Sequence, residues 1–265
     1  MTEADFYLTY KGVYVPKEYH SPESLRYCEE FRFRPDDILI ATFPKSGTTW
    51  TQEIVPLVLS RGDPASVESL PNIQRCPWVE ETEASRVRLE DRSSPRVMTT
   101  HLCYHMMPLS FFTAKPKVIY VMRNPKDVLI SLYYYHHMSV AYGSWFDHVR
   151  SWVNAEDKSH ILYISYEEMC WDLKVAVRRI SKFLDKPLED ELIEKIADRC
   201  EFKNMKKNNM SNYSTLNIID QSKFQFLRKG ITGDWKNHLT DEEVQMFDAV
   251  YKKNTQDINY QFIWD

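Results

Sequence analysis

The chain has 265 residues, of which 43% are hydrophobic and 27% are charged, and its net charge is −4. This balance is that of a globular protein, and we expect a single domain over residues 1–265. The acidic balance argues against nucleic-acid binding, which usually brings a basic excess. Five cysteines without a CxxC pair or metal spacing indicate free thiols and a cytoplasmic location. We expect no membrane association, because no apolar run approaches a membrane span and the N-terminus lacks a signal-peptide core.

Four short apolar runs predict strands that are buried on both faces, since they lack strict alternation: Ile38–Phe43, Val97–Thr100, Val118–Met122 and Ile161–Ser165. Helical patterns lie between or after them, at Trp50–Ser60, Lys126–Tyr135, Leu173–Phe183 and Glu189–Arg199. Alternating strands and helices predict an α/β fold with a central parallel β-sheet flanked by helices on both faces. Ligands of such folds bind at the carboxyl ends of the strands.

The segment after the first strand is dense in groups that bind anions. Pro44 is followed there by Lys45, Ser46, Gly47, Thr48, Thr49 and Trp50. A strand, a tight turn and a helix N-terminus aim backbone N–H groups and hydroxyls at one point, so we predict a phosphate-binding loop. It differs from a Walker A loop, because Lys45 precedes the glycine instead of following it. The alternative is a plain strand-to-helix turn with a surface lysine.

The other three predicted strands also end at polar residues. His101 follows the second strand, and a histidine can accept a proton near neutral pH, although a lone histidine is usually structural. Arg123 follows the third strand, and Ser131 lies eight residues further on in the next helix. An arginine and a hydroxyl can bind a second phosphate. The alternative is an ion pair between Arg123 and Asp127. Tyr166 follows the fourth strand.

The last third of the chain predicts a long ordered loop, Lys206–Asp234, and then a helix. The loop contains Arg228, Lys229 and Gly230, and two cations before a glycine allow a close approach to phosphate. The alternative is a solvated basic turn. The helix is expected to begin at Thr240, with acidic residues in its first turn: Asp241, Glu242 and Glu243.

Three of these motifs, in this order, resemble the cytosolic sulfotransferases. Thr42–Trp50 matches the 5′-phosphosulfate loop of that family, T-[YF]-P-K-S-G-T-[TN]-W, without a departure. Residues 120–131 resemble its 3′-phosphate loop, and residues 228–238 contain its R-K-G-x-x-G-D-W-K-N signature. The resemblance covers residues 10–262. It is closest to the hydroxysteroid or alcohol sulfotransferases, on the stretches Pro77–Glu80, Tyr142–His148 and Met210–Ser214.

The resemblance implies transfer of a sulfuryl group from PAPS (3′-phosphoadenosine 5′-phosphosulfate) to a hydroxyl, with PAP as the product. It implies that the donor is bound by Lys45, Ser46, Gly47, Thr48, Thr49, Trp50, Arg123, Ser131, Tyr166, Phe202, Met205, Arg228, Lys229 and Gly230. Adenine would stack between Trp50 and Phe202, with Tyr166 at its edge. His101 would be the general base. Lys45 would stabilise the leaving phosphate, and Ser131 would hold Lys45 back until an acceptor binds.

The acceptor is expected to be a small apolar molecule with a hydroxyl, such as a hydroxysteroid or another alcohol, with phenols as the alternative. Trp78 and Tyr135 are candidates to line its pocket beside His101, and a role in the core is the alternative for both. We expect no metal. A rival kinase function would need an aspartate for Mg²⁺ at a strand end, where this chain has Arg123. A non-catalytic protein that binds apolar ligands is the other rival.

Three departures from the family pattern concern the pocket and the assembly. The resemblance implies a further helix-length segment before Tyr142, so either the chain lacks it or a stretch is missing from the sequence as written. Cys200 stands where the family usually has Thr or Ser. A homodimer is possible, but its motif K-x-x-x-T-V-x-x-x-E is degraded. The chain keeps the lysine and the threonine of this motif as Lys236 and Thr240. Asp241 replaces the valine, and Gln245 replaces the glutamate.

Overall fold

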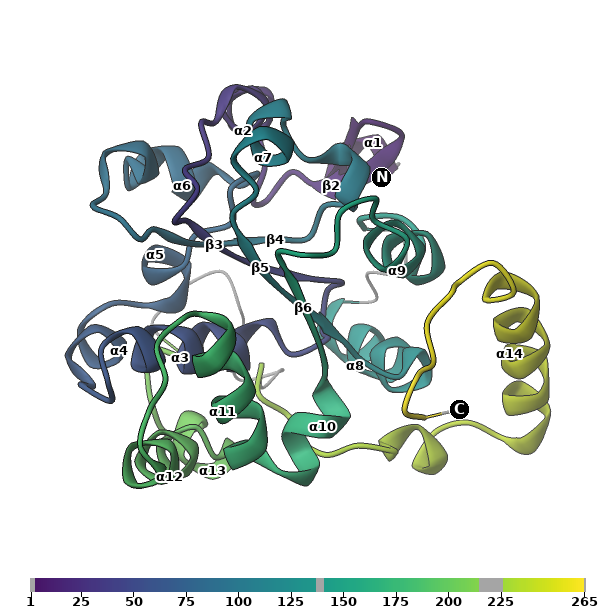
Figure 1. Ribbon diagram of the computed structural model, residues 1–265. Coiled ribbons are helices and arrows are strands. Elements are labelled where there is room, and N and C mark those ends of the chain that lie inside the picture. Colours follow the sequence, from purple (N-terminus) through teal and green to yellow (C-terminus); the bar gives the residue numbers. More distant parts are fainter. Residues whose placement is uncertain (1–2, 137–140, 215–225, 265) are drawn as a thin grey trace.

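The computed structural model describes residues 3–136, 141–214 and 226–264. A four-stranded parallel sheet in the order β4-β3-β5-β6 forms its centre (Figure 1). The strands are β3 (Ile38–Thr42), β4 (Val97–Thr100), β5 (Lys117–Met122) and β6 (Ile161–Ser165). Each lies within one residue of its predicted bounds, and the predicted α/β class is confirmed.

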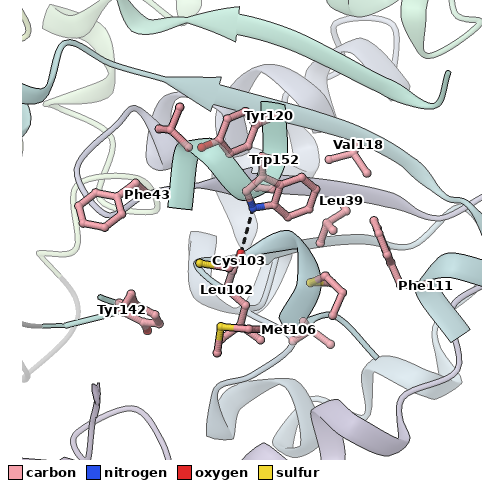
Figure 2. Packing of buried hydrophobic residues seen from close by; sticks show 14 of the residues in the cluster. Leu39, Phe43, Leu102, Cys103, Met106, Phe111, Val118, Tyr120, Tyr142 and Trp152 are labelled. Atoms are coloured by element: carbon pink, nitrogen blue, oxygen red, sulfur yellow. Dashed lines mark hydrogen bonds between the residues drawn. The ribbon is translucent and has the colours of Figure 1, made fainter. Parts of the chain in front are cut away.

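Both faces of this sheet are buried, as the continuous apolar runs predict. Along β3, Leu39 and Ala41 belong to one hydrophobic cluster, whereas Ile38 and Ile40 belong to a second cluster on the opposite face. Figure 2 shows part of the first cluster, in which Trp152 donates its indole N–H to the carbonyl of Leu102 at 3.0 Å. The strand ends are therefore fixed between two packed layers.

Helices cover these two faces. The second cluster packs under α3 (Thr48–Leu59), α11 (Leu173–Phe183) and α12 (Asp190–Arg199), which also contact one another. The first cluster packs under α2 (Pro22–Glu30), α7 (Leu109–Ala114) and α9 (Trp145–Val153) (Figure 1). Helix α8 (Pro125–His136) begins just after β5. The four predicted helices correspond to α3, α8, α11 and α12, with ends that differ by at most two residues.

Several short elements were not predicted. The N-terminal hairpin pairs β1 (Tyr7–Tyr10) with β2 (Val13–Pro16) across a two-residue turn, in which both residues have positive φ. Such a turn matches the twist of the paired strands. Short helices complete the connections, and they are too brief to show a helical period: α1 (Glu3–Phe6), α4 (Ala65–Ser69), α5 (Asn72–Arg75), α6 (Thr82–Arg86), α10 (Tyr166–Trp171) and α13 (Phe202–Met205).

The C-terminal helix α14 (Asp241–Asn254) confirms the predicted start. Thr240 caps it, and the Glu243 side chain completes a capping box. The helix stands at the edge of the molecule and buries no residue of its own (right in Figure 1). Asp241 and Gln245, which replace the dimer-motif residues, are both exposed on it.

The five cysteines are free, as predicted, and four of them are buried. None of the helices in the described ranges is long and apolar enough to cross a membrane. The position at which the family resemblance implies a further segment, before Tyr142, falls on residues 137–140, outside the described residues.

Candidate active site

A cavity lies at the carboxyl ends of all four strands of the central sheet. A residue that lines the cavity follows each strand: Lys45 after β3, His101 after β4, Arg123 after β5 and Tyr166 after β6. The structure brings every predicted site residue except Ser46 into this wall. The others that line it are Gly47, Thr48, Thr49, Trp50, Trp78, Ser131, Tyr135, Phe202, Met205, Arg228, Lys229 and Gly230.

The loop between β3 and α3 presents unpaired donors to this cavity. Gly47 is the N-cap of α3, and no side chain in the described ranges caps the helix. The backbone N–H groups in the first turn of α3 therefore remain available to an anion. Gly47 has φ 112°, and a Cβ there would lie 3.1 Å from the Tyr166 ring, so only glycine fits. Ser46 is fully buried, and its Oγ finds no partner among the described residues.

Arg123 connects two loops of the cavity. It donates from Nη1 to the Lys45 carbonyl at 3.0 Å and from Nη2 to the Ile231 carbonyl at 3.3 Å. Its buried Nε has no partner in the part of the chain that the structure describes. The alternative of an ion pair with Asp127 is wrong, because that carboxylate accepts the N–H groups of Gly233 and Trp235 instead. Two of the five N–H groups of the guanidinium thus hold it in place, and donors remain for a ligand, the Nε–H among them.

The basic turn at residues 228–230 is structured. Arg228 and Lys229 both pair with Asp234, each at 2.6 Å, and the Lys229 side chain is also 43% exposed to solvent. Gly230 has φ 69°, and a Cβ on it would lie 2.2 Å from the ring of Phe202. Only glycine allows the backbone at residue 230 to lie this close to the Phe202 ring. The basic turn can therefore lie against the cavity wall.

Aromatic side chains form the part of the wall next to α3. Trp50 meets Tyr166 edge to face, with 5.3 Å between ring centroids, and Phe202 and Met205 line the cavity nearby. The Trp50 indole donates to the backbone carbonyl of Cys200 at 2.8 Å. The unusual residue at position 200 therefore contributes its carbonyl, which any residue would supply, and its thiol is fully buried.

His101 is held as a neutral base. Its Nδ1 lies 2.8 Å from the Thr42 carbonyl, and because a carbonyl can only accept, Nδ1 carries the proton and Nε2 keeps its lone pair. The backbone N–H of His101 donates to the Glu80 carboxylate at 2.7 Å. Burial lowers the pKa of His101 to about 4. The rings of Trp78 and Tyr142 flank the imidazole, at 5.7 and 5.2 Å between centroids.

The ammonium of Lys45 lies between two aromatic rings. Its Nζ is 4.2 Å from the Tyr135 ring centroid and 3.9 Å from that of Phe226, whose negative faces attract a cation. Burial, followed by the charges of Arg123 and Arg228, lowers the pKa of Lys45 to about 7. Ser131 lines the cavity, but it forms no hydrogen bond to Lys45 within the described ranges. The contact that the family resemblance implies between these two residues is absent from this structure.

Further residues of the wall were missed by the sequence analysis. Trp78 forms an isolated bridge with Thr99 of β4, which brings the stretch Trp78–Glu81 beside His101. Glu80 and Tyr142 belong to stretches that supported the family resemblance, yet neither was given a role. Tyr19 comes from an irregular N-terminal segment that carries no recognisable signal. The missed wall residues include Tyr19, Glu81, Tyr142, Tyr213 and Phe226; Glu80, also missed, does not line the cavity but accepts the backbone N–H of His101.

The fold and this cavity are those of an enzyme that binds an anionic nucleotide and transfers a group from it. The sulfotransferase domain family matches residues 35–259, and the chain belongs to that family. It is a PAPS-dependent sulfotransferase, and its resemblance to the hydroxysteroid subgroup is confirmed. The rival functions, a small-molecule kinase and a non-catalytic binding protein, are thereby set aside.

Individual relatives support this assignment along nearly the whole chain. Sulfotransferase 2B1 of Mus musculus is 43% identical over 282 aligned positions, which cover 98% of this chain and 83% of that protein. The 3-beta-hydroxysteroid sulfotransferase of Cavia porcellus is 41% identical, with 94% of each chain covered. The crystal structure of mouse sulfotransferase SULT7A1 complexed with PAP superposes with a TM-score of 0.76 at 29% identity, covering 94% of this chain and 95% of that one.

Proposed function

We propose that this sulfotransferase moves the sulfuryl group of PAPS to the hydroxyl of a hydroxysteroid or a similar apolar alcohol. The observation that carries the proposal is one cavity that joins an uncapped helix N-terminus, a buried arginine and a histidine with a free Nε2. Aromatic rings form much of the wall around His101, which suits an apolar acceptor. Relatives at 43% and 41% identity are named as sulfotransferase 2B1 and 3-beta-hydroxysteroid sulfotransferase.

The residues present fit a doubly anionic adenosine donor. The buried Ser46 Oγ and Arg123 Nε have no partners in the described ranges, and both belong to the two predicted anion loops. Buried polar atoms without partners are rare and indicate a missing ligand contact. When bound, PAPS supplies an activated sulfuryl group and leaves as PAP.

We assign the donor's three parts to three groups of residues. The phosphosulfate end is bound at the N-terminus of α3, by Lys45, Ser46, Gly47, Thr48 and Thr49. The 3′-phosphate is bound by the residues after β5 and in the basic turn: Arg123, Ser131, Arg228, Lys229 and Gly230. Adenine is bound among the aromatic and sulfur-containing side chains Trp50, Tyr166, Phe202 and Met205.

His101 acts as the general base and accepts the acceptor's hydroxyl proton at Nε2. A pKa of about 4 keeps the imidazole neutral at working pH, and the Thr42 carbonyl fixes the tautomer that leaves Nε2 free. Lys45 stabilises the negative charge that develops on the phosphate, which requires its ammonium to leave the ring faces and turn toward the loop. Ser131 lies on the same wall and is assigned to orient this ammonium.

The direct test mixes the purified protein with labelled PAPS and a panel of hydroxysteroids, other alcohols and phenols. We expect label transfer to hydroxysteroids or alcohols, and we expect turnover to persist in EDTA because loop cations replace a metal. Parallel reactions with labelled ATP serve as the control and should give no transfer. Failure to label any acceptor would contradict the proposed function, and turnover that vanishes in EDTA would contradict only the metal-free prediction.

The affinity for PAP is expected to fall as the pH rises above neutrality. The pKa of Lys45 is about 7, so its ammonium is present below that pH and is lost above it. Binding of an anion favours the charged form, so the dissociation constant should rise by up to about tenfold per pH unit between pH 7 and pH 9. Calorimetric titration with PAP measures this. The Lys45→Arg variant is the control, because its guanidinium stays charged and should flatten the profile.

We also propose a cytosolic location. The five cysteines remain free, and the half-buried Cys170 would be open to oxidation in an oxidising compartment.

A further inference from the structure

The acceptor side of the cavity contains a carboxyl group that the proposed mechanism does not use. Glu81 lines the cavity together with Trp78 and His101, and it is only 7% exposed. It lies close enough to act electrostatically on the phenol groups of Tyr19 and Tyr135. The carboxyl is therefore a largely buried group of the cavity wall in the neighbourhood of these tyrosines.

This carboxyl has no partner within the described ranges of the chain. Its backbone N–H donates to the Trp78 carbonyl, but its side chain forms no hydrogen bond and no ion pair there. The charged groups near it are also carboxylates: Glu18, Glu80 and Glu83. Its neighbour Glu80 differs in one respect, because its Oε1 accepts the backbone N–H of His101 at 2.7 Å, although its buried Oε2 has no partner among the described residues. A buried polar group without a partner destabilises the folded protein unless a ligand satisfies it.

Among the described residues of this part of the wall, Glu81 supplies a carboxyl acceptor without a partner, and the buried indole Nε1 of Trp78 is a donor without one. The hydroxyls of Tyr19 and Tyr135 lie 3.4 Å apart and can satisfy each other. The Tyr142 hydroxyl lies 3.3 Å from Nε2 of His20. Pro16, Ile73 and Ala141 complete the wall with apolar surface. A purely apolar acceptor would seal the carboxyl away from water and leave it unpaired.

We propose that Glu81 determines acceptor specificity by binding a second hydrogen-bond donor of the acceptor, a hydroxyl or an amine other than the hydroxyl that reaches His101. This inference rests on the proposed function and names the class of acceptor: an apolar skeleton with two separated donor groups. A pocket that is built to bind a donor discriminates against the analogue that lacks it, because its own polar group is then left unpaired. Glu81 is a specificity residue and takes no part in the proton transfer.

The test compares two steroids that differ only in one distant hydroxyl, with PAPS as the donor. The wild-type chain should prefer the dihydroxy steroid in kcat/KM by about fivefold, the effect of one ordinary hydrogen bond, because burial and the neighbouring carboxylates raise the pKa of Glu81 and favour its neutral form. Glu81→Leu should lose that preference, through a lower kcat/KM for the dihydroxy steroid alone. Glu81→Gln should keep part of it, because its amide oxygen still accepts a hydrogen bond. A third steroid with an amine at the distant position shows whether a cation is preferred, and a preference for either donor supports the proposal.

A matched control and an independent readout distinguish a ligand contact from a structural role. Glu18→Leu removes an exposed carboxylate that also acts on Tyr19, so it should leave the preference intact. Glu81→Leu should raise Tm in the absence of acceptor, because it removes an unpaired buried carboxyl. Equal losses for both steroids, or no wild-type preference, would overturn the proposal. A wild-type chain that sulfates neither steroid nor any other acceptor would instead overturn the proposed function.

Discussion

His101→Ala is expected to remove sulfuryl transfer and to leave PAP binding unchanged. The lone pair on Nε2 is the base of the proposed mechanism, and its loss should lower kcat by about 10²–10⁴-fold. The backbone contact from residue 101 to Glu80 persists in the variant, so the wall should keep its shape. Steady-state rates with saturating PAPS and a hydroxysteroid measure the first effect, and calorimetry with PAP measures the second.

His105→Ala is the matched control for this prediction. His105 lies four residues further on, is exposed and stands outside the cavity wall, so its replacement should leave kcat unchanged. The pH profile gives a second check. Because the pKa of His101 is about 4, the wild-type rate should stay level between about pH 5 and pH 6.5, where an ordinary histidine would become protonated. Substantial turnover by His101→Ala would contradict the assignment of the base, and loss of PAP binding would indicate a structural role.

The predicted parts of the site share one physical cause. Residues at the carboxyl ends of neighbouring parallel strands meet at one edge of the sheet, so strand ends alone place Lys45, His101, Arg123 and Tyr166 together. The apolar runs define these strands clearly because both of their faces are buried. The chain order of strands and helices therefore predicts the sheet and the position of the cavity.

The missed parts depend on contacts between distant segments, which no local pattern records. Tyr19 and Tyr135 are 116 residues apart and meet only through the folded N-terminal segment. The ring of Phe226 beneath the Lys45 ammonium belongs to a loop without periodicity. Glu81 stands directly beside Glu80 in the sequence, and only the fold shows that Glu80 binds the His101 backbone whereas the Glu81 side chain binds no group of the described residues.

The length of the chain relative to its relatives bears on the acceptor pocket. The alignment with mouse sulfotransferase 2B1 spans 282 positions, which exceeds the 265 residues of this chain, so that relative has residues that this chain lacks. The family resemblance implies such a difference before Tyr142, whose ring flanks His101. The acceptor range of this chain should therefore be measured directly.

Arg123→Ala is expected to weaken PAP binding by about 100-fold. Two charge-assisted hydrogen bonds to a phosphate contribute about 3 kcal/mol together, which corresponds to that factor. Arg123 also joins the Lys45 loop to the loop that contains Ile231, so the variant should loosen two groups of donors at once. Calorimetric titration with PAP measures the affinity, and thermal unfolding of the same samples reports whether the fold is intact.

Arg123→Lys separates the effect of charge from that of geometry. Lysine keeps the positive charge of Arg123 but lacks the planar guanidinium, which contacts two backbone carbonyls while its Nε stays free. We therefore expect the PAP affinity of Arg123→Lys to lie between that of the wild type and that of Arg123→Ala. Arg178→Ala, which removes a partly exposed arginine that pairs with Asp190 outside the cavity, should leave PAP binding at the wild-type value. Unchanged PAP affinity in a folded Arg123→Ala protein would show that the 3′-phosphate lies elsewhere. In that case a ligand other than the 3′-phosphate would have to bind the buried Nε of Arg123, which has no partner among the described residues.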